Sequence, residues 1–253
     1  MATADTFISH LIELRDRLLK SVVAVALVFL CMFPWASDIY ALLAKPMLAA
    51  LPKGGQMIAT EVASAFFVPM KVTMLAAFVV ALPWVLYQIW AFVAPGLYVH
   101  EKRLVGPLIV VSTLLFICGM AFAYFLVFPL VFGFIVGVAP QGVAVMTDIG
   151  KYLDFVLTMF MAFGVTFEVP VVVVLLVRVG VVSLAQLKTA RPYVIVGAFV
   201  IGAIFTPPDV VSQFMLAVPL WLLYEVGMVV ARLVDKPAAT AENYQSGGGR
   251  SAE

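Results

Sequence analysis

The chain has 253 residues, of which 64% are hydrophobic and 11% charged, and its formal net charge is +1. Soluble domains average roughly 45–50% apolar and about 25% charged residues, so this composition excludes a soluble globular protein and indicates an integral membrane protein. The nearly balanced charge lacks the basic stripe of a nucleic-acid-binding surface, which excludes that class. Cys31 and Cys118 lie within apolar runs, a placement that indicates neither a disulfide framework nor a metal site.

Six apolar runs are candidates for membrane-spanning helices, which need roughly 20 residues to cross about 30 Å of hydrocarbon. They cover residues 18–37, 72–94, 104–138, 155–177, 193–206 and 210–231. No turn signal divides the long third run around Gly119, so we expect one helix that bends or ends near Pro129. The fifth run reaches only about 21 Å as a helix and is compatible with a short span or a re-entrant segment.

The positions of lysine and arginine distinguish these two topologies, because cytoplasmic segments collect basic residues. With six spans, eleven of the fifteen basic residues fall on the side of the two termini, whereas a non-crossing fifth run would divide them eight against seven. We therefore predict an all-α membrane protein with six transmembrane helices, short fifth and sixth helices, and both termini in the cytoplasm. One domain covers residues 1–234, and the polar, Gly-rich residues 235–253 form a disordered tail.

The segment before the first span, about residues 6–17, has the pattern of an interfacial amphipathic helix. Its apolar face holds Phe7, Leu11, Leu14 and Leu18. The i, i+4 pairs on its polar side are Glu13 with Arg17 and Asp16 with Lys20. Because exposed pairs of this kind contribute only about 0.3–0.5 kcal/mol, the spacing alone indicates no more than a surface helix.

The loop after the second span, "WAFVAPGLYVHEKR", contains a carboxylate, Glu101. A carboxylate at headgroup level is suited to receive a guanidinium group through two parallel hydrogen bonds. The alternative is an ordinary ion pair with Lys102, Arg103 or Arg15, and the residues alone favour that alternative.

The stretch "FGVTFEVPVVVVLL" places Glu168 inside an otherwise apolar run of the fourth span. A charge at the bilayer centre costs roughly 2.5–3.5 kcal/mol, so an acid here indicates either a partner contact or a transport pathway. The other polar residues of the spans include Gln88, Gln213 and Glu225. Glu225 lies close enough to the terminal side to snorkel or to pair with Arg232.

Motifs for catalysis and nucleotide use are absent from the sequence. There is no G-x-x-x-x-G-K-[ST] phosphate loop and no H-E-x-x-H, and neither of the two histidines stands with a Ser or Cys in the membrane. We therefore predict that the protein is not an enzyme and has no cofactor. A proton-coupled secondary transporter of a small solute, with Glu168 as the proton carrier, stays open as an alternative. Against it, no convincing internal repeat relates the two halves of the chain.

Seven stretches taken in order resemble the TatC family, the multi-spanning receptor subunit of the twin-arginine protein translocase. They run from about residue 7 to residue 232 and read "SHLIELRDRL", "MIATEVASAFF", "YQIWAFVAPGLYVHEKR", "MAFAYFLVFPLVFGF", "MAFGVTFEVPVVVVLL", "RPYVIVGAFVIGA" and "TPPDVVSQ". The resemblance implies a concave, glove-like bundle in a bacterial inner membrane that binds twin-arginine signal peptides and single-span partners of the TatA and TatB type. It also implies self-association and export of folded proteins driven by the proton motive force.

The resemblance also implies roles for individual residues, carried over by motif. The signal-peptide residues are Glu101, Glu13, Phe92, Arg15, Arg17 and Leu11. The partner-helix residues are Glu168, Gln213, Met215 and Tyr124, and the external caps are Pro46 and Asp209. In the first group the two carboxylates would receive the guanidinium groups of the signal. In one respect the chain departs from the family pattern, because the loop "VRVGVVSLAQLKTARPY" carries few basic residues before its Arg-Pro.

Overall fold

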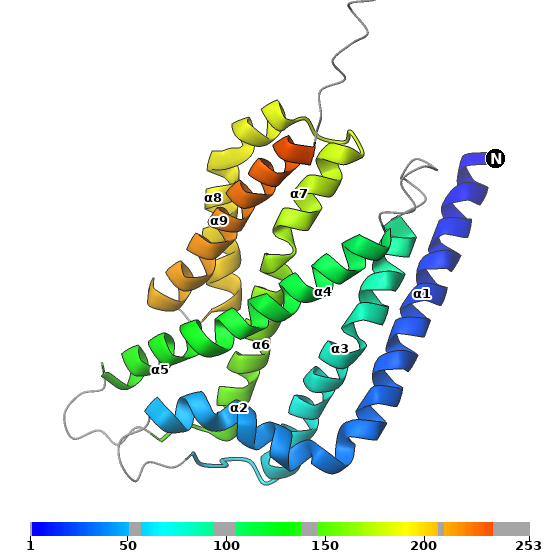
Figure 1. Ribbon diagram of the computed structural model, residues 1–253. Helices are drawn as coiled ribbons and strands as arrows, with labels where there is room; N and C mark the ends of the chain where they lie inside the picture. Colours follow the sequence, from blue (N-terminus) through cyan, green and yellow to red (C-terminus); the bar gives the residue numbers. More distant parts are fainter. Residues whose placement is uncertain (1, 51–56, 94–104, 138–145, 207–209, 235–253) are drawn as a thin grey trace, which may run out of the picture.

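The computed structural model describes residues 2–50, 57–93, 105–137, 146–206 and 210–234 (Figure 1). Six helical segments within these residues are long and apolar enough to cross a membrane. They are Ile8–Lys45, Ser64–Phe92, Gly106–Gly137, Ile149–Arg178, Leu184–Phe205 and Val210–Val234. The prediction of six spans is confirmed, and the fifth and sixth are the shortest of the six. The predicted tail, Glu101 and Asp209 lie outside the described residues.

The first helix, α1 (Ala2–Met32), includes the predicted interfacial segment, so that segment and the first span form one continuous helix. After the turn η1 (Phe33–Trp35) the chain continues as α2 (Ala36–Ala50), which crosses the lower end of the molecule in Figure 1. Pro34 stands at the start of this turn, where its missing N–H removes a bond that a straight helix needs. The predicted first span ends at residue 37, so α2 is an element that the apolar runs did not predict.

The second span, α3 (Ser64–Val93), lies alongside α1 (Figure 1). It begins at Ser64 rather than at residue 72, because the helix accommodates Pro69 instead of starting after it. A helix can continue through a proline when the rest of its backbone bonds are kept, and this one also contains Pro83. Part of the segment expected as an external loop is therefore helical.

The third span consists of α4 (Val105–Phe122), a π-helical turn η4 (Ala123–Val127) and α5 (Phe128–Gly137). The wide turn ends just before Pro129, whose ring cannot fit against the carbonyl four residues earlier in a regular helix. One long run that bends near Pro129 is what the sequence predicts, and the structure confirms it.

The fourth span breaks at Glu168 into α6 (Ile149–Phe167) and α7 (Val169–Arg178). Pro170 has no N–H, so the turn tightens here and the Glu168 N–H donates to the Val165 carbonyl at 3.1 Å. Asp148 caps the N-terminus of α6 by accepting from the Lys151 N–H. The break therefore places the side chain of Glu168 between two shorter helices.

The last two spans are α8 (Leu184–Phe205) and α9 (Val210–Val234), which pack side by side (Figure 1). Helix α8 begins at Leu184 rather than at residue 193, because Ser183 and Gln186 form a capping box and the helix continues through Pro192. The expected start after Pro192 is wrong, and the full helix has 22 residues, enough to span a bilayer. A re-entrant segment is therefore not needed.

The core lies where α4, η4, α5, α6 and α9 meet, around the fully buried side chains of Phe128, Phe163 and Leu216. Glycines allow α4 and α6 to come into direct backbone contact. A Cβ at Gly119 would lie 2.5 Å from the Phe163 carbonyl oxygen, and one at Gly164 would overlap the Phe116 ring. Close approach at small residues is how helices associate in a lipid environment, where no hydrophobic force drives them together. The helices around Glu168 are thus tightly held.

Candidate functional site

The first candidate site lies where the N-terminal part of α1 faces the end of α3. Glu13 and Arg17 stand one turn apart on α1, and the Arg17 Nη2 and Nε both donate to Glu13 Oε1, at 2.6 and 2.9 Å. Arg17 Nη1 also reaches Gln88 Oε1 on α3 at 3.5 Å. Gln88 is only 4% exposed, whereas Glu13 and Arg17 stay half-buried at the surface. The structure thus links the predicted Glu13–Arg17 pair to a buried amide of the next span.

Two aromatic rings extend the same site. His10 on α1 stacks on Phe92 of α3, with ring centroids 4.2 Å apart and planes 19° from parallel. His10 Nδ1 lies 3.9 Å from Glu13 Oε2. Phe92 and Glu13 are therefore neighbours through His10, a contact that the spacing of the sequence did not predict because it joins two helices.

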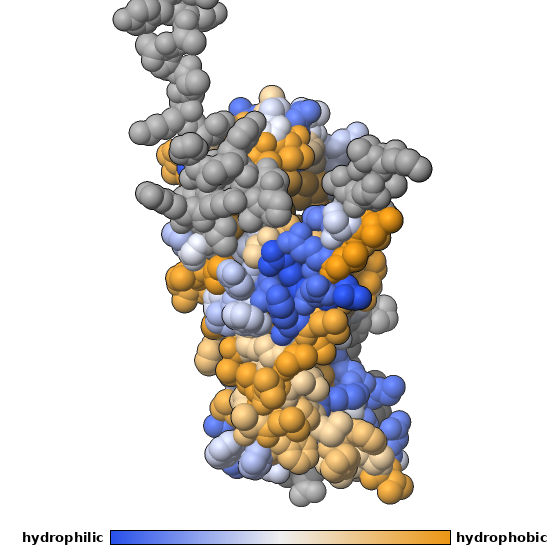
Figure 2. All heavy atoms as spheres, turned by 90° about the vertical axis from the view of Figure 1, so that its right-hand side faces the viewer, coloured by the Kyte–Doolittle hydropathy of each residue, from blue (hydrophilic) through white to orange (hydrophobic). Residues whose placement is uncertain are grey.

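The remaining predicted residues of α1 are more exposed. Leu11 is an exposed apolar side chain, and Arg15 donates to Asp16 at 2.9 and 3.1 Å. The predicted pair of Asp16 with Lys20 is thus replaced by a pair between sequence neighbours. Figure 2, which faces α1, shows hydrophilic side chains gathered in the upper part of this side above a broad apolar surface. A charged patch above an apolar band is the surface expected of a helix that emerges from a membrane.

The second candidate site is Glu168, at the junction of α6 and α7. Both of its carboxylate oxygens are buried and have no hydrogen-bond partner. The Ser112 hydroxyl of α4 lies beside the carboxyl group and accepts a bond from Trp90 Nε1 at 3.2 Å, which leaves its own O–H as a neighbouring donor for Glu168. A buried polar atom without a partner costs about 1–3 kcal/mol, so it calls for an explanation beyond folding.

The other predicted partner-helix residues do not share one location. Gln213 on α9 donates from Nε2 to the Phe199 carbonyl of α8 at 3.0 Å, beside Gly202. Met215 and Tyr124 instead pack against the core cluster around Phe128. Gln213 therefore holds α8 to α9, while the other two border the centre of the molecule.

A proline of α2 explains the position of Tyr124. Pro46 has no N–H, so the carbonyl of Leu42 loses its helical partner, and the Tyr124 hydroxyl donates to that carbonyl at 2.8 Å. The Tyr152 hydroxyl of α6 donates to the neighbouring Leu43 carbonyl, also at 2.8 Å. The predicted role of Pro46 as an external cap stays a prediction. Tyr124 and Tyr152 both anchor α2 through hydrogen bonds to its carbonyl groups, and the sequence did not predict the bond from Tyr152.

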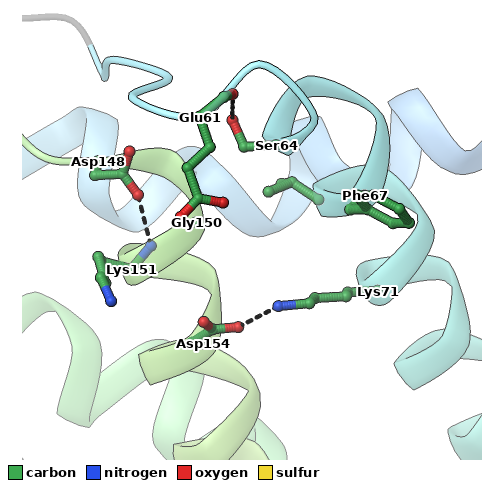
Figure 3. A pocket seen from close by; sticks show the side chains of 9 residues that line it. Glu61, Ser64, Phe67, Lys71, Asp148, Gly150, Lys151 and Asp154 are labelled. Carbon is green, nitrogen blue, oxygen red and sulfur yellow. Dashed lines mark hydrogen bonds and ion pairs between the residues drawn. The ribbon is translucent and has the colours of Figure 1, made fainter.

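A polar pocket of about 170 Å³ lies between the starts of α3 and α6 (Figure 3). Lys71 and Asp154 form an ion pair of 2.7 Å across it. Next to them, Asp148 Oδ2 accepts from the N–H and the hydroxyl of Thr60, at 3.0 and 2.6 Å, which ties the residues before α3 to α6. The Thr60 hydroxyl, followed by the Lys151 and Thr60 N–H groups, lowers the pKa of Asp148 to about 2. The signal in the sequence is Asp148 itself, an N-cap residue that precedes an apolar run.

Glu225 forms an ion pair, as the sequence suggested, but its partner is Arg191 rather than Arg232. Its Oε2 accepts from Arg191 Nη2 of α8 at 2.5 Å. No group of three or more His, Cys, Asp or Glu side chains among the described residues could hold a metal ion. Unlike Glu225, Glu168 has two buried carboxylate oxygens without a hydrogen bond.

Among the described residues, six apolar helices, a charged pair towards one end of the first span and an unpaired acid inside the fourth define a multi-span membrane protein with two polar sites. The family model for the Sec-independent protein translocase protein (TatC) matches residues 9–219. The Sec-independent protein translocase protein TatC of Azotobacter chroococcum mcd 1 is 57% identical over 236 residues, covering 92% of each chain. That of Escherichia coli strain K12 is 55% identical over 234 residues, covering 92% of this chain and 91% of its own.

Solved structures agree with these relatives. A crystal structure of the twin-arginine translocase receptor TatC matches with a TM-score of 0.79 and 38% identity, covering 90% of this chain and all of its own. The chain belongs to the TatC family of translocase components. This result supports protein translocation over the proton-coupled solute transporter, and the family is not one of enzymes.

Proposed function

We propose that this protein is the twin-arginine signal-peptide receptor and the scaffold of a Tat translocase that exports folded proteins using the proton motive force. The observation that carries the proposal is the match over nine-tenths of the chain to a solved structure described as the twin-arginine translocase receptor. Its location would be the bacterial inner membrane, with both termini in the cytoplasm. The distribution of basic residues supports that orientation, since eleven of fifteen lie on the terminal side.

The signal peptide would bind at the terminal end of α1 and α3. Glu13 is supported as a guanidinium acceptor because it already accepts from a guanidinium group, that of Arg17. Glu101 would be the second acceptor, in the loop that follows α3. The rings of Phe92 and His10 and the exposed Leu11 offer apolar surface beside the carboxylate, suited to the residues around an arginine pair. Arg15 and Arg17 would shape the edge of this surface.

Single-span partners of the TatB and TatA type would bind at Glu168. Its unpaired oxygens favour this role, because a polar side chain on a partner helix would supply the missing hydrogen bond. Hydrogen bonds between helices in lipid average only about 0.6 kcal/mol, which suits an assembly that must come apart again. Gln213, Met215 and Tyr124 would form a second contact region, where Gln213 has its Oε1 to offer since Nε2 is used within the chain.

Site-specific crosslinking tests the receptor proposal. A photoreactive residue at position 92 should label a twin-arginine signal peptide in the native chain, and the labelling should fall when Glu101→Ala is introduced or when the signal carries two lysines. A lysine ammonium cannot form the paired hydrogen bonds of a guanidinium group. Labelling that is indifferent to both changes would overturn the assignment of the site.

A further inference from the structure

Glu13 is already in contact with an arginine of its own chain. The guanidinium group of Arg17 directs two N–H groups at a single oxygen, Glu13 Oε1, at 2.6 and 2.9 Å. The other oxygen, Oε2, lies 3.9 Å from His10 Nδ1, which is too long for a hydrogen bond. The pair therefore lacks the parallel two-oxygen geometry in which guanidinium and carboxylate bind most strongly.

This pair is also open to exchange. The side chain of Glu13 is 36% exposed and that of Arg17 24% exposed, so a second guanidinium group can approach the carboxylate from outside. An exposed pair of this kind is worth only about 0.2–1 kcal/mol. A ligand that engages both oxygens of Glu13 would bind more strongly than Arg17 does.

The neighbouring helix offers Arg17 a second acceptor. Gln88 Oε1 lies 3.5 Å from Arg17 Nη1, at the limit of a hydrogen bond, and Gln88 is 4% exposed. The guanidinium group thus reaches both acceptors at once, through different nitrogen atoms. Arg17 can therefore leave the carboxylate without losing all of its hydrogen-bond partners.

We propose that Arg17 is an internal substitute for the signal arginine: it occupies Glu13 at rest, and an incoming guanidinium group replaces it while Arg17 moves to Gln88. This inference rests on the proposed function and adds a resting state of the site to it. A signal arginine can displace Arg17 because it can bind both oxygens of Glu13. A signal lysine makes a single-point contact with the carboxylate and binds more weakly for that reason, while the resident guanidinium lowers the apparent affinity of both signals by the same factor.

Peptide binding to the full-length protein in lipid nanodiscs tests the exchange. Fluorescent signal peptides with Arg-Arg or Lys-Lys are titrated against the native chain, Arg17→Gln and Lys20→Gln. Removing the resident arginine should raise the affinity for both peptides by the same factor of about three- to fivefold, because an internal competitor weakens every ligand of Glu13 alike. Lys20→Gln removes the same charge from the same helix but leaves the pair with Glu13 in place, so it should raise both affinities by less. Arg17→Lys, which keeps the charge, should fall between the native chain and Arg17→Gln.

Gln88→Leu provides the second readout. In the native background it should weaken Arg-Arg binding about threefold, because the displaced Arg17 loses its acceptor, whereas in the Arg17→Gln background it should have no effect. Unchanged affinities in Arg17→Gln, or a loss of Arg-Arg binding there, would overturn the exchange. A native chain that does not distinguish the two peptides at all would instead overturn the proposed receptor function.

Discussion

Two carboxylates of this protein meet opposite conditions. Asp148, at the N-terminus of α6, accepts from two groups of Thr60 and from the Lys151 N–H, whereas Glu168, inside the fourth span, accepts from none. The first carboxylate holds two segments of the chain together. The second has the Ser112 hydroxyl beside it but no bond of hydrogen-bond geometry. The comparison separates a carboxylate whose bonds are complete within the fold from one whose bonds are not, and the second kind is the one for which we propose a ligand.

Disrupting the close contact between α4 and α6 near Glu168 should have the largest effect on the free energy of unfolding. In Gly119→Ala the new methyl group would meet the Phe163 carbonyl oxygen at 2.5 Å, so α4 must move away from α6. We expect a loss of about 2–3 kcal/mol in the free energy of unfolding, measured by thermal or denaturant unfolding in detergent. Gly133→Ala is the matched control, because nothing lies within 4 Å of its Cβ and its stability should stay unchanged or rise slightly. Equal effects of the two substitutions would contradict the close helix contact.

Removing the unpaired carboxyl group should separate stability from recognition. We expect Glu168→Leu to stabilise the isolated protein by about 1–2 kcal/mol, because a buried group without hydrogen bonds is replaced by an apolar one. The same substitution should weaken crosslinking to a single-span partner. Glu225→Leu is the contrasting variant and should destabilise the protein, since it leaves Arg191 without its ion-pair partner. A Glu168→Leu protein that is less stable and still crosslinks normally would contradict the comparison.

Removing the Asp148 carboxylate should have a local effect on the segment before α3 and on the start of α6. The pKa of Asp148 in the folded protein is lowered from 3.8 to about 2, so its bonds stabilise the fold above pH 4 and are lost as the pH falls from about 4 towards 2. Asp148→Asn should therefore speed amide hydrogen exchange at neutral pH at Thr60 and at Ile149, whose N–H donates to the Ile58 carbonyl at 2.8 Å. In the native protein the protection of these amides should not change between pH 5 and 8. A steep change within that range would show that another group controls the segment.

The smallest effect is expected for the anchor of α2. Tyr124→Phe removes the hydrogen bond to the Leu42 carbonyl and should cost about 0.6 kcal/mol, the average for such bonds in membrane proteins. Tyr152→Phe removes the equivalent bond to Leu43 and gives a second measurement of the same anchor. Unfolding of the two single variants and of the double variant shows whether the anchors act independently. A double variant as stable as the native chain would mean that the hydroxyl groups do not hold α2.

The sequence predicts the spans well because a bilayer imposes length and apolarity on every crossing helix. It fails where proline is read as a boundary, as at Pro69 and Pro192, since both residues lie inside helices in the structure. It also fails at α2, which is too short and too polar at its start to stand out as a separate apolar run. A local sequence pattern does not show which neighbouring helices pack around a proline or against a short segment such as α2.

The candidate sites divide in the same way. Glu13 with Arg17 follows from helical spacing, and Glu168 stands out because it is an acid in an apolar run. The contacts of Arg17 with Gln88, of His10 with Phe92 and of Thr60 with Asp148 join segments far apart in the chain. No periodicity within one helix reveals them. They depend on the packing of α1 against α3 and of the residues before α3 against α6.

The central claim is that Glu13 and Glu168 serve two different ligands, a signal peptide and a partner helix. The direct test measures both interactions in the same nanodisc preparation, with Glu13→Gln and Glu168→Gln compared with the native chain. The account predicts that Glu13→Gln weakens binding of the Arg-Arg peptide and spares partner crosslinking, while Glu168→Gln does the reverse. If each substitution weakens both interactions to the same extent, the two carboxylates act on one ligand and the account is wrong.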